Sequence, residues 1–269
     1  MFVAGNTIIS AINVSKKQVL KNRIPVINYA VESRSDSLKV FNEYKKLSNE
    51  IDESYKVALK LTSFDMNIKL INNIIDIFVD KNVKVLIDAE NNKYNNEYNK
   101  ITQSLLNKYN KNDINIYKTY QMYRKDSLST LMYDMNFCNK NNLFLGTKIV
   151  RGAYWNNENK IGHLFINKSD TDRSYNNAII SLYEYEGYSG NILATHNTES
   201  INLGILLNER KENIFSFAHL LDMKTKKYNQ ITKEGKNVHV YIPYGPYNEM
   251  IPYLGRRLYE NLDTFKYLL

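Results

Sequence analysis

The sequence predicts a (β/α)8 barrel, the TIM-type α/β fold in which eight parallel strands close into a ring surrounded by helices. Two observations lead to this fold class. Short runs rich in β-branched and aromatic residues alternate with longer segments of helical pattern, and strands separated by helices pair in parallel. The chain has 269 residues, close to the roughly 250 of a single barrel. We therefore expect residues 1–269 to form one barrel domain.

Eight segments are predicted to be the strands. They are Ile24–Tyr29, Tyr55–Leu61, Val83–Asp88, Ile114–Tyr120, Phe144–Val150, Asn191–Thr195, Ile214–Ala218 and Val238–Tyr241. Helices are expected between them near residues 37–50, 66–80, 95–110, 127–140, 171–186, 197–210 and 223–231. An extra N-terminal helix, from about Thr7 to Lys21, precedes the first strand and is expected to cover the bottom or side of the barrel.

The end of the last strand is predicted from turn-forming residues. Pro243, Gly245 and Pro246 follow Tyr241; proline lacks an N–H group, and both residue types favour turns. We therefore expect these residues to break the strand and a final helix to begin at about Asn248.

The composition indicates a globular chain without disulfides. Hydrophobic residues make up 43% and aromatic residues 12%, which excludes a disordered chain. The one cysteine, Cys138, can form no disulfide within the chain and fits a reducing compartment. The sequence shows neither a signal-peptide pattern nor an apolar run long enough to cross a bilayer, so a cytoplasmic location is expected.

Charge and motifs narrow the function classes. The formal net charge of +8 allows nucleic acid, an anionic membrane surface or an anionic substrate as partner. Residues 91–100 mix Lys and Asn with Glu, so a coding bias explains the charge better than nucleic-acid binding. The sequence lacks GxGxxG, P-loop, HExxH and GxSxG patterns and paired cysteines, so Rossmann, P-loop, zinc and serine-hydrolase chemistry are unsupported.

Polar residues gather at the carboxyl ends of the predicted strands. In chain order they are Lys60, Asp88, Glu90, Tyr120, Gln121, Lys148, Arg151, Tyr154, Thr195, His196, Asn197, His219 and Tyr241. A single one has an ordinary explanation, such as a helix cap for Thr195 or Asn197 or a core position for His219. In a barrel, however, all of these ends face one mouth, where barrel enzymes hold their active sites. Without metal ligands, this cationic mouth suits a phosphate-bearing organic cofactor.

A pair of arginines near the C-terminus adds a possible carboxylate clamp. Tyr253, Arg256, Arg257 and Glu260 have helical spacing along one face. Adjacent guanidinium groups can bind a small carboxylate bidentately. The alternative is a solvated arginine pair with a surface contact between Arg256 and Glu260.

Several segments resemble the proline dehydrogenase (proline oxidase) family, whose members are FAD-dependent (β/α)8 barrels. These segments are Val57-Ala-Leu-Lys-Leu-Thr62, Leu86-Ile-Asp-Ala-Glu90, Thr119-Tyr-Gln-Met-Tyr123, Lys148-Ile-Val-Arg-Gly-Ala-Tyr-Trp155, Ala194-Thr-His-Asn197 and the terminal region from Tyr241 to Asn261. They occur in the order found in the family and cover essentially the whole chain. The Arg-Gly-Ala-Tyr-Trp and Tyr-Leu-Gly-Arg-Arg segments are the most specific.

The resemblance implies roles for named residues. Arg256 and Arg257 would bind the carboxylate of L-proline, with Lys60 adding charge, and Asp88 would orient flavin and substrate. The residues that would enclose the pyrrolidine ring are Tyr154, Tyr241 and Tyr253. The residues that would bind FAD are Gln121, Lys148 and Arg151 on the flavin and ribityl side, Thr195, His196 and Asn197 on the pyrophosphate and adenosine side, and His219.

The sequence departs from the family pattern at three positions expected on the cofactor side. His219 stands where glutamine is frequent, Lys118 where Gln or Asn is frequent, and Lys148 where arginine is frequent. These changes bear on flavin affinity and potential and not on the substrate clamp. Tyr253 is retained, which favours proline over hydroxyproline.

The implied reaction is hydride transfer from L-proline to the flavin, giving Δ1-pyrroline-5-carboxylate, the first step of proline catabolism to glutamate. A quinone or another acceptor would reoxidise the flavin, with possible peripheral membrane association. Two alternatives stay open: an oxidoreductase for a related cyclic amino acid, and a catalytically silent barrel that acts as a binding or scaffold protein. Nucleic acid is not expected as a partner, because the cationic residues converge on strand ends.

Overall fold

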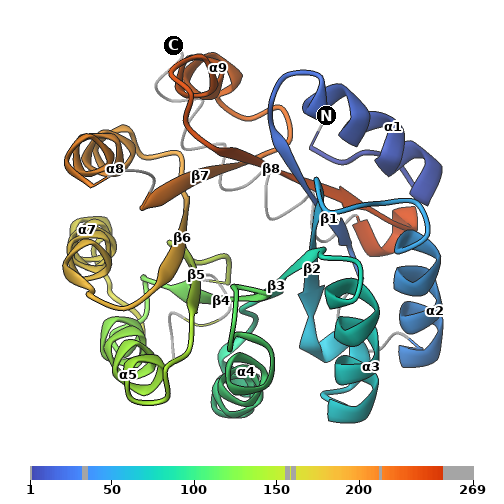
Figure 1. Ribbon diagram of the computed structural model, residues 1–269, viewed down its shortest axis with the longest axis horizontal. Coiled ribbons are helices and arrows are strands. Elements are labelled where there is room, and N and C mark those ends of the chain that lie inside the picture. The colour runs from blue at the N-terminus through green and yellow to red at the C-terminus, as the bar shows by residue number, and fades with distance from the viewer. Residues whose placement is uncertain (1, 32–35, 155–157, 159–161, 212–213, 251–269) are drawn as a thin grey trace.

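A computed structural model describes residues 2–31, 36–154, 158, 162–211 and 214–250, and in this part of the chain eight parallel strands form a closed barrel (Figure 1). Each strand pairs with the next along the chain, and β8 pairs with β1. The strands are β1 (Ile24–Tyr29), β2 (Lys56–Lys60), β3 (Lys84–Asp88), β4 (Ile116–Gln121), β5 (Leu145–Val150), β6 (Ser189–Ala194), β7 (Phe215–Leu220) and β8 (Val238–Tyr244). The predicted fold class is confirmed.

Helices surround the barrel (Figure 1). They are α1 (Ile8–Val19), α2 (Ser37–Leu47), α3 (Ile68–Val79), α4 (Asn95–Tyr109), α5 (Ser127–Lys140), α7 (Lys168–Glu184), α8 (Thr198–Arg210) and α9 (Thr225–Lys233), with short 3-10 helices η1 (Leu61–Phe64) and η2 (Asn92–Tyr94). Each predicted helix within the described residues is present, including the extra N-terminal one.

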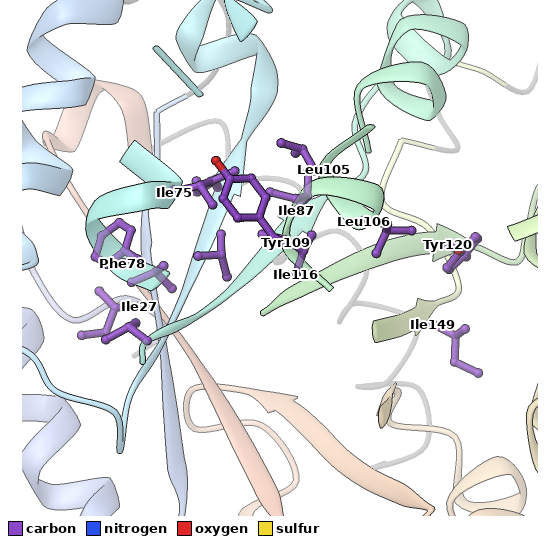
Figure 2. Packing of buried hydrophobic residues seen from close by; sticks show 14 of the residues in the cluster. Ile27, Ile75, Phe78, Ile87, Leu105, Leu106, Tyr109, Ile116, Tyr120 and Ile149 are labelled. Atoms are coloured by element: carbon purple, nitrogen blue, oxygen red, sulfur yellow. The ribbon is translucent and has the colours of Figure 1, made fainter. Parts of the chain in front are cut away.

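Helix α3 shows why these segments are helical. Its buried residues Ile71, Ile74, Ile75 and Phe78 have i, i+3, i+4, i+7 spacing and form one apolar face. The Asn67 side chain accepts hydrogen bonds from the first-turn N–H groups and caps the helix. Figure 2 shows side chains of α3 and α4 packed near outward-facing residues of the strands. The main core therefore lies between the barrel wall and the helices.

The inside of the barrel is filled by a second, smaller core. Its buried members are Val26, Ala58, Leu86, Tyr117, Ile192 and Ala218. Close packing at this level leaves the carboxyl ends of the strands as the place for a site, as in other barrels of this type. Side chains alternate between the two faces of each strand. A residue therefore faces the lumen when it lies an even number of positions from an inner-core residue of its strand, which we call inward parity, and faces the helices otherwise, which we call outward parity.

Helix α1 covers the outside of the barrel next to β1 and β8, between α9 and α2 (Figure 1). Ala11 and Ile12 of this helix belong to the main core. The chain after β8 continues at the mouth: the N–H of Gly245 donates to the carbonyl of Gly5 at 3.1 Å, and Met250 packs with Val3 and Ala30. The helix expected from about Asn248 is present at its start, because residues 247–250 are helical.

The expectation that Pro243 breaks the last strand is wrong. Strand β8 continues through Pro243 to Tyr244 and pairs with β1 there. Its pairing with β7 ends earlier, at Tyr241. Among the described residues, β8 beyond Tyr241 therefore has β1 as its one strand neighbour, and a proline without an N–H is tolerated at such an edge.

Candidate active site

Asp88, at the end of β3, joins three strands inside the mouth. Its Oδ1 atom forms an ion pair with the ammonium group of Lys148 on β5, and its Oδ2 atom accepts a hydrogen bond from the Tyr241 hydroxyl on β8. The Lys148 nitrogen also lies 5.3 Å from the centre of the Tyr241 ring. Asp88 and Lys148 are almost fully buried, so each charge depends on the other for compensation.

Lys60 lies beside this trio. It is the register partner of Asp88 on the neighbouring strand β2, and its side chain is buried. It has the parity of the inner-core residue Ala58 and so faces the lumen. The structure therefore brings together Lys60, Asp88, Lys148 and Tyr241, which the sequence predicted as site residues.

Glu90 links two further strand ends at the mouth. Its carboxylate accepts hydrogen bonds from the backbone N–H of Thr62, at 3.1 Å, and from the Thr62 hydroxyl. Its backbone carbonyl accepts a hydrogen bond from the Gln121 side chain at 2.9 Å. Glu90 was predicted at a strand end without a role, and its position two residues after Asp88 is the signal that the sequence offers.

Arg151 lies in a separate part of the mouth and binds several groups. Its Nε atom donates to Asp172 at 2.7 Å, one Nη atom donates to the Thr195 hydroxyl, and the other donates to the Ser200 hydroxyl at 3.0 Å. The guanidinium carbon lies 4.4 Å from the centre of the Tyr175 ring. Although burial opposes it, hydrogen bonds from Lys168 and Arg151 hold the pKa of Asp172 below its usual value.

The residues predicted for the adenosine side lie next to Arg151. The Thr195 hydroxyl accepts the N–H of Asn197 at 3.1 Å, and the Asn197 side chain caps α8 by accepting the N–H of Ser200 at 3.0 Å. The backbone carbonyl of His196 accepts a hydrogen bond from Lys224 at 2.8 Å. A capped helix start beside a guanidinium group is a setting that favours anions.

The structure does not bring His219 into the lumen. Its parity on β7 is that of the main-core residue Phe217, and its ring stacks on Tyr228 of α9, with 4.3 Å between ring centres. Its Nδ1 atom lies 2.8 Å from the Leu220 carbonyl. Burial lowers the pKa of His219 to about 4, so the ring is neutral at pH 7.

Contrary to expectation, Lys118 does not lie on the cofactor side. Its ammonium group pairs with Asp134 of α5 at 2.6 Å, and the Tyr120 hydroxyl donates to the same carboxylate at 2.8 Å. Both residues have the outward parity of Ile116 on β4. Lys118 therefore belongs to the contact between the barrel wall and its helices, and Tyr120, also counted among the polar strand ends, faces the same way.

Tyr154 is described and lies at the mouth, half-buried, in the segment after β5. Tyr253, Arg256 and Arg257 lie outside the described residues. Sequence reasoning missed Glu158, which is buried and accepts hydrogen bonds from the N–H of Asn92 and, at 2.9 Å, from the Tyr123 hydroxyl. These contacts attach the segment after β5 to those after β3 and β4.

The described residues contain no group of three or more His, Cys, Asp or Glu side chains placed to hold a metal ion. Among the same residues, no helix is long and apolar enough to cross a membrane.

Comparison with known proteins gives the family. Residues 8–266 match the family described as Proline dehydrogenase. The chain belongs to the proline dehydrogenase family. Curated relatives include Proline dehydrogenase 1, mitochondrial, of Dictyostelium discoideum, 30% identical over 95% of this chain and 46% of the relative, and Hydroxyproline dehydrogenase of Xenopus laevis, 32% identical over 68% and 43%. The chain thus spans less than half the length of these relatives.

Solved structures give the same fold for this proline dehydrogenase family member. Proline utilization A (PutA) from Bdellovibrio bacteriovorus, inactivated by N-propargylglycine, matches with a TM-score of 0.89 at 20% identity, over 96% of this chain and 32% of that chain. PutA from Bradyrhizobium japonicum (mutant D779Y) matches with a TM-score of 0.84 at 19% identity, over 96% and 30%. The barrel is therefore the part of these longer proteins that the present chain shares.

Proposed function

We propose that this chain is a flavin-dependent dehydrogenase that uses FAD to oxidise L-proline to Δ1-pyrroline-5-carboxylate. The observation that carries the proposal is the buried trio of Asp88, Lys148 and Tyr241 at the mouth of a barrel that belongs to the proline dehydrogenase family. A catalytically silent barrel would have no need to direct a buried ion pair into its lumen, because replacing both partners of such a pair with apolar residues is often neutral or stabilising.

The lumen suits a flavin because it offers polar atoms that lack partners. Within the described chain, the Asn28 side-chain oxygen and the Thr119 hydroxyl are buried without a hydrogen-bond partner. Both residues have the inward parity of the inner core. A ring system that carries both donors and acceptors would satisfy these atoms. Lys148 and Gln121 would hold the ring, and Thr195 with the start of α8 would hold the pyrophosphate.

The bound flavin would supply the acceptor for the hydride removed from the substrate. The protein's part is to hold the substrate close to it in one orientation. Lys60 supplies a buried positive charge for the substrate carboxylate. Arg256 and Arg257 complete the clamp in this proposal: they follow soon after Met250, and the chain has already reached the mouth at that residue.

The local charge also favours the reactive form of proline. Hydride leaves the carbon next to the nitrogen only when the amine is neutral. The negative charge of Asp88 is already compensated by Lys148, and in this proposal Arg256 and Arg257 add the positive charge that makes the mouth cationic. A cationic site disfavours an ammonium group and lowers the pKa of the bound amine.

A cyclic amino acid other than proline is the second candidate. One relative is named Hydroxyproline dehydrogenase, and the retained Tyr253 argues for proline as the better substrate. Dye reduction with FAD-loaded protein, compared for L-proline and 4-hydroxy-L-proline, separates the two. Faster turnover of 4-hydroxy-L-proline than of L-proline would contradict the proposal that L-proline is the substrate.

The electron acceptor and the cellular location form part of the same proposal. A quinone at a membrane surface fits a flavin enzyme of this family, and peripheral contact with the membrane would then be required. Several relatives carry the word mitochondrial in their names, whereas the sequence led us to expect a cytoplasmic chain. Reoxidation of proline-reduced protein by a short-chain quinone, followed by absorbance, tests the acceptor.

The direct assay of the proposed activity combines two readouts. Protein loaded with FAD is given L-proline and an artificial electron acceptor, and product is identified by mass. Acceptor reduction together with a mass loss of two hydrogens from proline supports the proposal. Protein that binds FAD but reduces no acceptor with either proline or hydroxyproline favours the silent barrel.

A further inference from the structure

Two buried tyrosines from the surrounding helices replace strand pairing at the mouth. The Tyr98 hydroxyl of α4 accepts the N–H of Thr119 at 3.0 Å. The same hydroxyl lies 2.9 Å from the carbonyl oxygen of Thr119 and 3.1 Å from that of Ile87, so two carbonyl groups share its one proton. The Tyr44 hydroxyl of α2 accepts the N–H of Tyr29 at 3.2 Å and donates to the Ala58 carbonyl at 2.7 Å. In each case one hydroxyl bridges the backbones of two neighbouring strands, β3 and β4 or β1 and β2.

The hydroxyls lie where the strands separate. The register between β3 and β4 ends at Ile87 and Lys118, although β4 continues to Gln121 beside β5. The register between β1 and β2 ends at Asn28 and Ala58, although β2 continues to Lys60 beside β3. The strands that carry Lys60 and Asp88 thus stay paired, while the gaps on both sides of that pair are bridged by tyrosine.

The same gaps contain two of the buried polar atoms that lack a hydrogen-bond partner among the described residues. Asn28 is the last residue of β1 that is in register with β2, and Thr119 is the first residue of β4 beyond its pairing with β3. The Asn28 oxygen and the Thr119 hydroxyl are buried without hydrogen-bond partners in the described chain. Both face inward, whereas the tyrosine hydroxyls reach the gaps from the helix side. At Thr119 the tyrosine satisfies the backbone from outside. The Ala58 carbonyl accepts from Tyr44 outside and from the Asn28 side-chain amide, at 3.0 Å, inside. In both gaps the inward oxygen is left for a ligand.

We propose that Tyr98 and Tyr44 are positioning residues for the flavin. The hydroxyl groups of these two tyrosines hold the barrel mouth open on both sides of the strands that carry Lys60 and Asp88. The inference rests on the proposed function, because it takes the flavin as the ligand. The Tyr98 hydroxyl also contacts the peptide before Asp88, through the Ile87 carbonyl that shares its proton with the Thr119 carbonyl. Loss of the hydroxyl lets the two strand ends shift and misplaces both Asp88 and Thr119.

Helix α4 contains a matched control. Tyr109 is also largely buried, and its hydroxyl contacts Asn72 and Asp76 of α3, not the strand ends. Tyr98→Phe and Tyr109→Phe therefore each remove one hydrogen-bonded phenol oxygen from the same helix. Only Tyr98→Phe removes one that bridges strands at the mouth.

The experiment measures FAD affinity by fluorescence quenching and backbone hydrogen exchange of the apoprotein around Thr119. For Tyr98→Phe we expect affinity to fall about fivefold or more, the size of one lost hydrogen bond, and exchange at Thr119 to accelerate. For Tyr109→Phe we expect the FAD affinity and the exchange rate at Thr119 to match those of the unchanged chain. Tyr44→Phe tests the second gap and replaces Tyr98→Phe if that variant does not fold.

A third variant distinguishes the effect of the Tyr98 bridge between the strands from the effect of the inward Thr119 hydroxyl. Thr119→Val removes the inward hydroxyl and keeps the N–H that donates to Tyr98; it should weaken FAD binding without faster exchange at that N–H. If Tyr98→Phe and Tyr109→Phe have the same FAD affinity and the same exchange, the positioning role is wrong. If the unchanged chain itself binds no FAD, the proposed function fails instead.

Discussion

Lys148 and Asp88 form an ion pair across the barrel lumen, although their strands, β5 and β3, are separated by β4. Tyr241 of β8 binds the other oxygen of the same carboxylate. Asp88, Lys148 and Tyr241 together therefore fix the relative positions of three strands that are not neighbours in the barrel. It also concentrates, at one point of the mouth, the groups that the proposed reaction requires.

Replacing Asp88 should affect stability and activity together. Asp88→Asn leaves the Lys148 ammonium buried without a counter-charge, and we expect the free energy of unfolding to fall by about 3 kcal/mol. L-proline turnover should fall by about two orders of magnitude or more, as when a group that organises a site is lost. Urea unfolding and dye reduction measure the two effects.

The control for this variant is Asp113→Asn. Asp113 also pairs with a lysine, Lys84, but its side chain is 63% exposed, so its loss should change the free energy of unfolding by less than about 1 kcal/mol. Equal effects of the two substitutions would show that the pair of Asp88 and Lys148 has no special role.

The pair of Lys118 and Asp134 should matter for folding alone. Lys118→Met leaves the Asp134 carboxylate buried and unpaired, which we expect to lower the free energy of unfolding by about 3–5 kcal/mol. Adding Asp134→Leu and Tyr120→Phe removes all three polar groups and should restore most of the loss. FAD affinity of the triple variant should equal that of the unchanged chain. A large loss of affinity would return Lys118 to the cofactor side.

His219 should make stability depend on pH. Its folded pKa of about 4 is below the unfolded value near 6.5, so below pH 6.5 the unfolded chain binds a proton that the folded chain does not. Stability from this group is complete above pH 6.5 and declines as the pH falls towards 4. Between pH 7 and pH 5 the loss should be about 2 kcal/mol.

The matched variant is His219→Gln, which cannot take up a proton. The fall in unfolding free energy between pH 7 and pH 5 should be smaller in this variant by about the amount just given. An unchanged pH dependence would mean that His219 is protonated in the folded protein.

Glu158 should influence substrate affinity without contacting substrate. Glu158→Gln keeps the shape but removes the charge that strengthens the hydrogen bonds from Asn92 and Tyr123. The segment that carries Tyr154 then becomes less well fixed, and we expect KM for L-proline to rise about fivefold with a smaller change in kcat. Glu209→Gln, an exposed residue on α8, should leave both constants unchanged. A rise in KM for both variants would contradict the anchoring role.

The sequence predicted the barrel well because strand and helix signals are local. The bounds of β1, Ile24–Tyr29, were predicted to the residue. The ends of most other elements differ by a few residues, the usual uncertainty of helix and strand ends. Pro243 was misjudged because the tolerance of a proline depends on whether a strand has a partner on that side, which is not a local property.

The site was predicted less completely for a different reason. Strands of a parallel barrel are buried on both faces, so their sequences do not alternate between polar and apolar residues. His219 was therefore assigned to the mouth, and the family resemblance placed Lys118 on the cofactor side, although both side chains face the helices. Glu158 was missed because its partners, Asn92 and Tyr123, come from distant parts of the sequence.

The most direct test of the proposed activity is an anaerobic spectrum. The protein is loaded with FAD, oxygen is removed, and L-proline is added while the flavin absorbance is recorded, with Asp88→Asn as the comparison. We predict rapid bleaching of the flavin in the unchanged chain and bleaching slower by about two orders of magnitude in the variant. A flavin spectrum that L-proline leaves unchanged would contradict the account.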